Sequence, residues 1–195
     1  VNARIQYRLA GEGAEKFMLE PESGVLRTAM MLDRETQQEY KLVATATDGG
    51  GLSCVTEIRI FLRDVNDNPP EFTGNFRDTL TVQEDARVNT LLTRVTTVDR
   101  DTGINRNTGY ELVETSPKVF SIHPKSGIIS LVGSLDREEH PEYNVTVIAY
   151  NEISRELSAT ATLRVVVLDV NDNPPTFERT SYYTAVSEAA NVGST

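Results

Sequence analysis

A motif of nine residues occurs twice in this chain, and the repetition limits the possible folds more than any other feature. Residues 64–72 read Asp-Val-Asn-Asp-Asn-Pro-Pro-Glu-Phe, and residues 169–177 repeat them with one change after a shift of 105 positions. A second motif, Asp-Arg-Glu, begins at Asp33 and again at Asp136. Motifs that return in order at a nearly constant spacing indicate tandem structural modules. We therefore expect modules of this length.

The pattern of side chains within each module is that of β-strands. Apolar and polar residues alternate over residues 40–47 and 56–62, and again over 143–149 and 161–167. Such alternation is typical of strands with one buried face and one solvent face. No segment shows a sustained helical period of apolar residues. The sequence predicts an all-β fold made of sandwich modules.

The Asn-Pro-Pro segments indicate where modules end, because proline cannot donate to a sheet ladder and restricts the residue before it. We expect residues 71–175 to form a complete module. Residues 1–70 correspond to the C-terminal part of a preceding module without its first strands, and residues 176–195 to the first strand of a following one. The 1–70 part should fold poorly alone, since its core and strand edges are left open.

Composition excludes several classes of function. The chain has 19 Lys and Arg against 29 Asp and Glu, a net charge of −10, which argues against a nucleic-acid partner because phosphates need clustered positive charge. No apolar run approaches the roughly 20 residues that span a bilayer. Cys54 is the single cysteine, so no internal disulfide forms, and its strand position predicts a buried, small apolar side chain.

Carboxylates are concentrated in the repeated motifs. Two carboxylates about 4 Å apart repel by about 4 kcal/mol at an effective dielectric constant of about 20, so a cluster favours a cation between them. Oxygen ligands without His or Cys select a hard cation, and many oxygens from loops suit Ca²⁺ better than Mg²⁺. The acids concerned are Asp33, Glu35, Asp64, Asp67, Glu84, Asp99, Asp101, Asp136, Glu138, Asp169 and Asp172.

Taken together, the motifs resemble those of extracellular cadherin repeats. The Asp-Arg-Glu motif, the Asp-Val-Asn-Asp-Asn-Pro-Pro motif and the Asp-x-Asp-x-Gly-x-Asn motif of residues 99–105 occur in that family in the same order, and the resemblance covers the whole chain. It implies tandem seven-stranded Greek-key sandwiches with three Ca²⁺ ions at each junction between repeats. Residues 48–54 further resemble long cadherins of the Fat and Dachsous type and some type III cadherins.

The resemblance assigns Ca²⁺ ligands to two junctions. The first junction, around residues 64–70, would use the side chains of Asp33, Glu35, Asp64, Asn66, Asp67, Asp99, Asp101 and Asn151 and the carbonyls of Val65, Asn68 and Asn105. The second junction, around residues 169–175, would use the side chains of Glu84, Asp136, Glu138, Asp169, Asn171 and Asp172 and the carbonyls of Val170 and Asn173. Each set lacks members that would lie outside residues 1–195.

Position 151 departs from the family pattern. The family usually has Asp where this chain has Asn151, whereas the first module keeps the acid as Asp48. An amide oxygen can still coordinate Ca²⁺, but one formal charge is lost, and Ca²⁺ affinity follows ligand charge. We expect this ion site to be the weakest at the first junction; the alternative is that Asn151 only caps the adjacent loop. The expected ligands are Asn66, Asn151, Asp99, Asp101 and the carbonyls of Asn68 and Asn105.

The resemblance implies Ca²⁺-dependent cell–cell adhesion on the extracellular face of the plasma membrane. The parent chain would be a single-pass membrane protein, its partners other cadherin ectodomains, in homophilic or heterophilic contacts, with no small-molecule substrate. A passive Ca²⁺-stiffened spacer is an alternative, which bead aggregation would distinguish from an adhesive unit. Paired carboxylates could also serve a hydrolase, but the acids fall at module ends rather than in one cleft, so we expect no enzyme.

A candidate modification site lies on the strand predicted over residues 143–149. Asn144-Val-Thr is an N-glycosylation sequon. Asn144 lies between Tyr143 and Val145, whose side chains should point inward, so its own side chain should face solvent. The sequence therefore predicts an accessible acceptor for a glycan.

Overall fold

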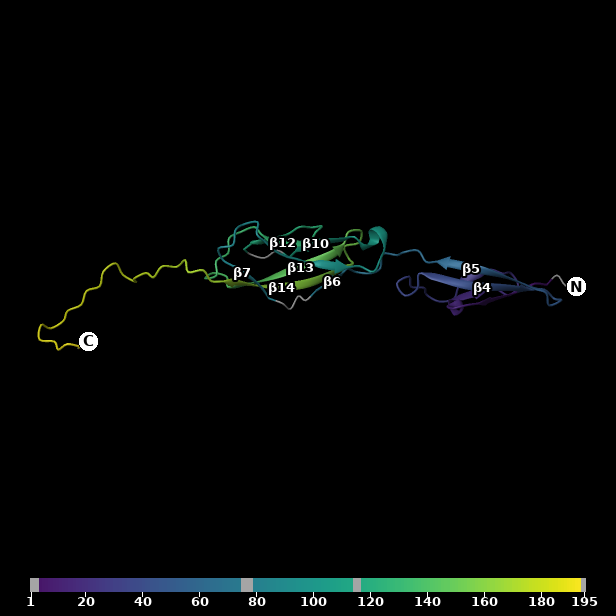
Figure 1. Ribbon diagram of the computed structural model, residues 1–195, viewed down its shortest axis with the longest axis horizontal. Helices are drawn as coiled ribbons and strands as arrows, with labels where there is room; N and C mark the ends of the chain where they lie inside the picture. The colour runs from purple at the N-terminus through teal and green to yellow at the C-terminus, as the bar shows by residue number, and fades with distance from the viewer. Residues whose placement is uncertain (1–3, 75–78, 114–116, 194–195) are drawn as a thin grey trace.

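A computed structural model describes residues 4–74, 79–113 and 117–193. The described chain is built from β-strands in two modules that follow one another along the long axis of the molecule (Figure 1). Helical structure in these residues is confined to two short 3₁₀ turns, η1 (Ala14–Lys16) and η2 (Gly103–Arg106). Within the same ranges, none of the helical segments has the length and apolar character needed to cross a bilayer.

The first module is organised around β4 (Glu39–Thr47). This strand pairs antiparallel with β1 (Gln6–Ala10) on one side and with β5 (Ser53–Phe61) on the other. A separate hairpin joins β2 (Phe17–Leu19) to β3 (Leu26–Thr28). The hairpin and the three-stranded sheet meet through a small apolar core.

Three apolar side chains, Phe17, Tyr40 and Leu42, are buried in that core. The rings of Phe17 and Tyr40 pack edge to face with centroids 5.0 Å apart, an arrangement that aromatic pairs favour. Cys54, in contrast, is exposed, and the prediction that it is buried is wrong. The physical reason is that the first five residues of β5 are all exposed, while the core lies at the other end of the strand, near Ile58.

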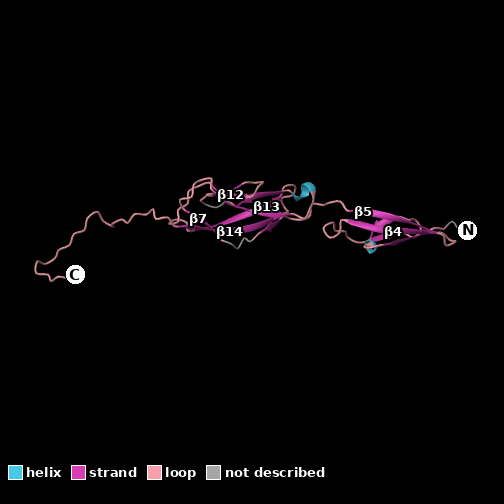
Figure 2. Ribbon diagram, viewed as in Figure 1, coloured by secondary structure: helices cyan, strands magenta, loops and turns pink. Residues whose placement is uncertain are grey.

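The second module contains a sheet of four strands in the order β10-β13-β14-β7. The long strands β13 (Glu142–Asn151) and β14 (Ser158–Leu168) pair antiparallel at its centre. β10 (Thr108–Leu112) pairs antiparallel with β13, and β7 (Leu80–Gln83) pairs parallel with β14. Figure 2 shows these strands and the loops that connect them.

A second sheet has the order β11-β12-β8, formed by Phe120–Ile122, Ile128–Leu131 and Leu91–Arg94. Two shorter strands, β6 (Glu71–Thr73) and β9 (Thr96–Val98), pair with one another. When β6 with β7 and β8 with β9 are each counted as one interrupted strand, the module has the seven strands expected of it. The expectation of an all-β sandwich is confirmed.

The core of the second module follows the alternation seen in the sequence. Val145, Val147 and Ala149 of β13 are buried, and each alternates with a more exposed residue. They pack in one cluster with buried residues from β14 and from the second sheet, among them Leu163, Val165, Val167, Phe120, Ile129 and Leu131. Burial of a continuous apolar face holds the two sheets together.

The segment after β14 differs from its expected form. Residues 176–193 form no strand and are exposed, although the sequence predicts a strand there. A strand needs a neighbouring strand to satisfy its backbone N–H and C=O groups, and the described residues offer this segment none. The module boundaries at residues 70 and 175 stay a prediction.

Gly127, in the turn between β11 and β12, provides a test of how tightly the sandwich is packed. Its φ is +67°, and a Cβ added there would lie 2.3 Å from the Val95 carbonyl oxygen. We expect Gly127→Ala to lower the free energy of unfolding by about 3 kcal/mol, from left-handed strain and a backbone collision. Gly103→Ala, at φ +59° with no atom within 4 Å, should cost only about 1 kcal/mol. If urea denaturation shows that the two variants lose the same free energy of unfolding, this expectation is contradicted.

Candidate metal centre

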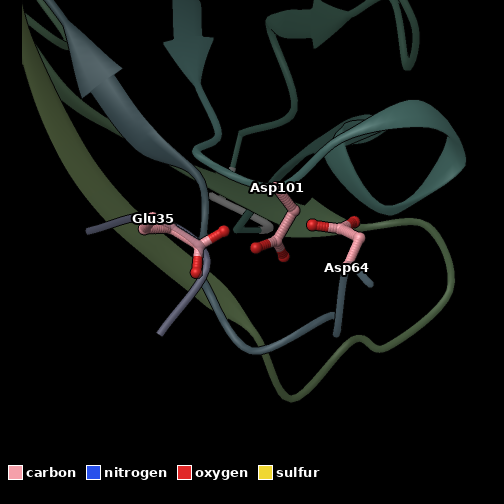
Figure 3. A group of neighbouring side chains, drawn as sticks. All are labelled: Glu35, Asp64 and Asp101. Atoms are coloured by element: carbon pink, nitrogen blue, oxygen red, sulfur yellow. The ribbon is translucent and has the colours of Figure 1, made fainter. Parts of the chain in front are cut away.

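The first junction brings together three carboxylates that are far apart in the sequence. Glu35 comes from the loop before β4, Asp64 from the segment after β5, and Asp101 from the loop after β9. One carboxylate oxygen from each lies within 4.8 Å of the others. Figure 3 shows the three groups gathered at this point. The junction therefore joins acids from the first module, the linker and the second module.

The guanidinium of Arg34 lies beside two of these acids. Its Nε is 2.5 Å from Asp64 Oδ1, and its Nη2 contacts Glu35 Oε1. Nη2 also donates to the Arg100 carbonyl oxygen at 3.0 Å, so this side chain bridges the two modules. Arg34 is only 8% exposed. Arg34 is not among the predicted site residues. An arginine stands at the centre of both copies of the Asp-Arg-Glu motif, and this repetition is a signal that could have identified it.

Asp64 is held by hydrogen bonds from the second module. Its Oδ2 accepts from the backbone N–H of Thr102 at 3.0 Å and from the Asn105 amide at 2.9 Å. Burial opposes ionisation of this carboxyl, but these hydrogen bonds and the Arg34 charge outweigh it and hold the pKa of Asp64 below its ordinary value. Asp64 is therefore ionised at neutral pH and attaches the linker to the second module.

Asp101 is buried at the junction, and Asp99, which is partly buried, is hydrogen-bonded to it. Asp101 is 2% exposed, and its two oxygens accept from the side-chain amide and the backbone N–H of Asn68 at 2.8 and 3.2 Å. Asp99 Oδ1 accepts from the Asp101 backbone N–H at 2.9 Å. Asp99 Oδ2, however, is buried and has no hydrogen-bond partner in the described residues.

This unpartnered oxygen fits a cation site. A buried carboxylate oxygen without a donor is costly, and a cation is one way to compensate it. The donor set consists of oxygen atoms, as hard cations such as Ca²⁺ prefer.

Besides Asp99, two acids predicted for this junction lie outside the group of three. Asp33 caps its own turn, where Oδ1 accepts from the backbone N–H groups of Glu35 and Thr36. The hydrogen bond from the Thr36 hydroxyl is the main reason that the pKa of Asp33 is lowered. Asp67 is exposed, and its Oδ1 accepts from the Asn68 amide at 2.7 Å. Both lie at the junction, and their role as ligands stays a prediction.

The second junction repeats this arrangement with Glu84, Glu138 and Asp172, whose oxygens also lie within 4.8 Å of one another. Glu84 is 7% exposed. Its Oε2 accepts from the Arg137 backbone N–H at 2.9 Å, and its Oε1 accepts from the Val170 N–H at 2.6 Å. Glu84 thus connects the early loop of the module to the Asp-Arg-Glu turn and to the segment after β14.

Apart from Glu84, the residues predicted for the second junction are exposed or partly exposed. Arg137 Nη1 lies 3.5 Å from Glu138 Oε1 and 3.2 Å from Asp169 Oδ1. Arg34 pairs in the same way with the equivalent acids Glu35 and Asp64. The Arg137 side chain is 43% exposed, compared with 9% for Arg34. Asp136 caps the backbone N–H of Glu139. Asn171 and Asn173 are exposed, and the Asn173 amide donates to Asp172 Oδ1.

The predicted glycan acceptor lies away from both junctions. Asn144 is on β13, opposite Arg164 of β14, and it is exposed, whereas Val145 beside it is buried. An enzyme could therefore reach the Asn144 side chain. Its modification stays a prediction.

A family model described as the cadherin domain matches residues 1–63 and 78–168. Protocadherin Fat 1 of Homo sapiens is 48% identical over 193 residues, which cover 98% of this chain and 4% of that protein. The protein dachsous of Drosophila melanogaster is 38% identical over 199 residues, which cover 100% of this chain and 6% of that protein. The chain thus corresponds to a small part of these relatives.

The fold has close counterparts among solved structures. The extracellular domain of protocadherin GammaB4 matches with a TM-score of 0.78 and 33% identity, over 92% of this chain and 28% of that one. Mouse cadherin-23 EC22-24 matches with a TM-score of 0.71 and 30% identity, over 88% and 56% of the two chains. Since the family model accounts for most of its residues and its relatives are similar over nearly all of its length, this chain belongs to the cadherin family.

Proposed function

We propose that this chain is a segment of an adhesion ectodomain in which Ca²⁺ stiffens the contact between successive repeats. Its membership of the cadherin family supports a place in an adhesion protein rather than in an enzyme. The observation that carries the proposal is the meeting of Glu35, Asp64 and Asp101 at one point, since these acids come from the first module, the linker and the second module.

Ca²⁺ would supply positive charge that several carboxylates from both modules share. The residues that would hold it at the first junction are Glu35, Asp64 and Asp101, whose oxygens lie together, and Asp99, whose Oδ2 has no hydrogen-bond partner in the described residues. Asp67 is proposed as a further ligand from the family pattern. Extracellular Ca²⁺ modules bind at roughly 10⁻⁴–10⁻³ M, a range in which binding responds to the concentration outside cells. The sharing of ligands would restrict bending at residues 62–70.

The protein's own contacts prepare this junction. Arg34 holds Glu35 and Asp64 close together, and its hydrogen bond to the Arg100 carbonyl joins the first module to the second. Asn68 holds Asp101 from the linker side. These contacts orient the carboxylates and offset part of their repulsion. Ca²⁺ would therefore add to an existing alignment.

The parent protein is proposed to be anchored in a membrane with these repeats outside the cell. One relative, 34% identical over 200 residues, carries the name cadherin EGF LAG seven-pass G-type receptor fmi-1, from Caenorhabditis elegans. Cadherin ectodomains are the proposed partners, and the exposed Asn144 is a proposed glycan acceptor. The name protocadherin among several relatives supports a role in contacts between such ectodomains.

Stiffening can be measured with two spin labels, one on each module. The native Cys54 is exposed on β5, and Thr160→Cys would provide a second exposed position on β14. We expect Ca²⁺ to narrow the distribution of distances between the labels relative to chelator, because shared ligands restrict the linker. Mg²⁺ at the same concentration should narrow it less, since Mg²⁺ retains more water. Identical distributions in Ca²⁺ and chelator would refute the proposal.

Asp67 allows a separate test of the ligand set, because it is exposed and outside both cores. We expect Asp67→Ala to abolish the Ca²⁺-dependent narrowing of the distance distribution and to weaken Ca²⁺ binding by about tenfold or more. Loss of a residue that only hydrogen-bonds to a metal ligand already has an effect of this size. Circular dichroism should show both sandwiches still folded. Glu156→Ala removes the same charge from an exposed loop and should have no effect. If Asp67→Ala binds Ca²⁺ as the parent does, Asp67 is not a ligand.

The burial of Arg34 predicts that replacing it lowers the free energy of unfolding more than replacing Arg137. In chelator, Arg34→Met should lower the free energy of unfolding by about 2 kcal/mol, somewhat less than the loss of a partner from a fully buried pair, because its carboxylates are partly exposed. Arg137→Met should cost at most about 1 kcal/mol, because that pair is exposed. Saturating Ca²⁺ should reduce the Arg34→Met loss. Urea denaturation in both conditions measures these values, and equal losses would contradict the assignment.

A further inference from the structure

The side chain of Asn151 is fully buried at the end of β13. Its Oδ1 accepts from the backbone N–H groups of Ile153 at 2.9 Å and Ser154 at 3.1 Å. Rotating the amide by 180° would place its NH₂ group against both of these donors. The loop after β13 therefore fixes the orientation of this amide, with the oxygen toward the loop and the nitrogen toward the linker.

The nitrogen of this amide is engaged at the first junction. Asn151 Nδ2 donates to Asn66 Oδ1 at 3.0 Å and contacts the Asn105 carbonyl oxygen. In return, Asn66 Nδ2 donates to Asn151 Oδ1 at 3.1 Å. Rotating the Asn66 amide would bring its nitrogen to 3.1 Å from Asp101 Oδ2 and 3.3 Å from the Asn105 carbonyl oxygen, which are acceptors, but also to 3.0 Å from Asn151 Nδ2, and its oxygen to 3.1 Å from Asn151 Oδ1. Because the loop fixes the Asn151 amide, the unrotated Asn66 is the orientation in which both contacts between the two amides pair a donor with an acceptor. The two amides thus form a reciprocal pair that joins the linker to the second module.

The first module shows the same position occupied by an acid. Asp48 Oδ1 accepts from the backbone N–H groups of Gly50 and Leu52, both at 2.9 Å. This oxygen caps the loop after β4 as Asn151 Oδ1 caps the loop after β13. At position 48 the second terminal atom is also an oxygen, able to coordinate a cation. At position 151 it is a nitrogen that carries two hydrogens, which repels a cation.

The ion expected beside Asn151 would lose ligands to the NH₂ group of this residue. Asn66 Oδ1 and the Asn105 carbonyl, two of the six expected ligands, face that group, which leaves the carboxylates of Asp99 and Asp101 and the Asn68 carbonyl. Asp99 Oδ2 is without a donor, but Ca²⁺ takes six to eight oxygens. Asn151 Oδ1 already accepts three hydrogen bonds, from Ile153, Ser154 and Asn66, and coordination through it, as the sequence suggested, would compete with them.

We infer that Asn151 replaces one Ca²⁺ of the first junction with a direct amide pair to Asn66. The inference rests on the proposed function, because it concerns how many ions that junction binds. The junction holds one ion fewer than an acid at position 151 would allow. Part of the attachment between the linker and the second module is consequently independent of Ca²⁺.

The experiment compares the 195-residue chain with its Asn151→Asp variant, using Ca²⁺ alone as the probe. Equilibrium dialysis at saturating Ca²⁺ should show that Asn151→Asp binds one more ion per molecule than the parent, because the new carboxylate oxygen faces Asn66 and Asn105. Asn107→Asp is the matched control: it adds the same charge at an exposed position after η2, and should bind the same number of ions as the parent.

Thermal unfolding gives a second measure. In chelator, Asn151→Asp should unfold at a lower temperature than the parent, since a carboxylate then faces two oxygens with no hydrogen between them. In Ca²⁺ the order should reverse. Equal, non-zero numbers of ions in the parent and Asn151→Asp would overturn this inference alone. If neither protein binds Ca²⁺, the proposed function fails together with it.

Discussion

The junctions of this protein depend on how the repulsion between neighbouring carboxylates is compensated. Glu35, Asp64 and Asp101 lie within a few ångströms of one another, where like charges repel strongly. Arg34 and the hydrogen bonds from Thr102, Asn105 and Asn68 offset part of that repulsion. The alignment of the two sandwiches follows from these hydrogen bonds and from the one that Arg34 donates to the Arg100 carbonyl, because each of them links a residue of the linker or first module to the second module.

The two junctions share a design but differ in solvent exposure. Arg34 is almost completely buried between modules, whereas Arg137, its counterpart, is largely exposed beside residues 169–175. A buried guanidinium interacts more strongly with its carboxylates, since little water screens the charges. Within the described residues the Asp-Arg-Glu turn is therefore buried in one copy and exposed in the other, because the second module packs on the first copy and the described residues place no module on the second.

Much of the site could be predicted from the spacing of motifs, although the behaviour of particular side chains could not. Alternating residues identified β4, β13 and β14, and repeated acids identified the junctions. The same alternation placed Cys54 inside, which is wrong, because period two shows which face a residue occupies but not whether anything covers that face. The bridging role of Arg34 was not foreseen, because it depends on a carbonyl 66 residues away.

Local chemistry along the chain was enough to determine the all-β modules, their order, and the gathering of acidic side chains where modules meet. Periodicity and proline act over a few residues, so they can be read without a structure. Only the tertiary structure decided the orientation of the Asn151 amide. A side-chain amide can present either an acceptor or a donor, and two backbone N–H groups of a folded loop select which of them faces the linker.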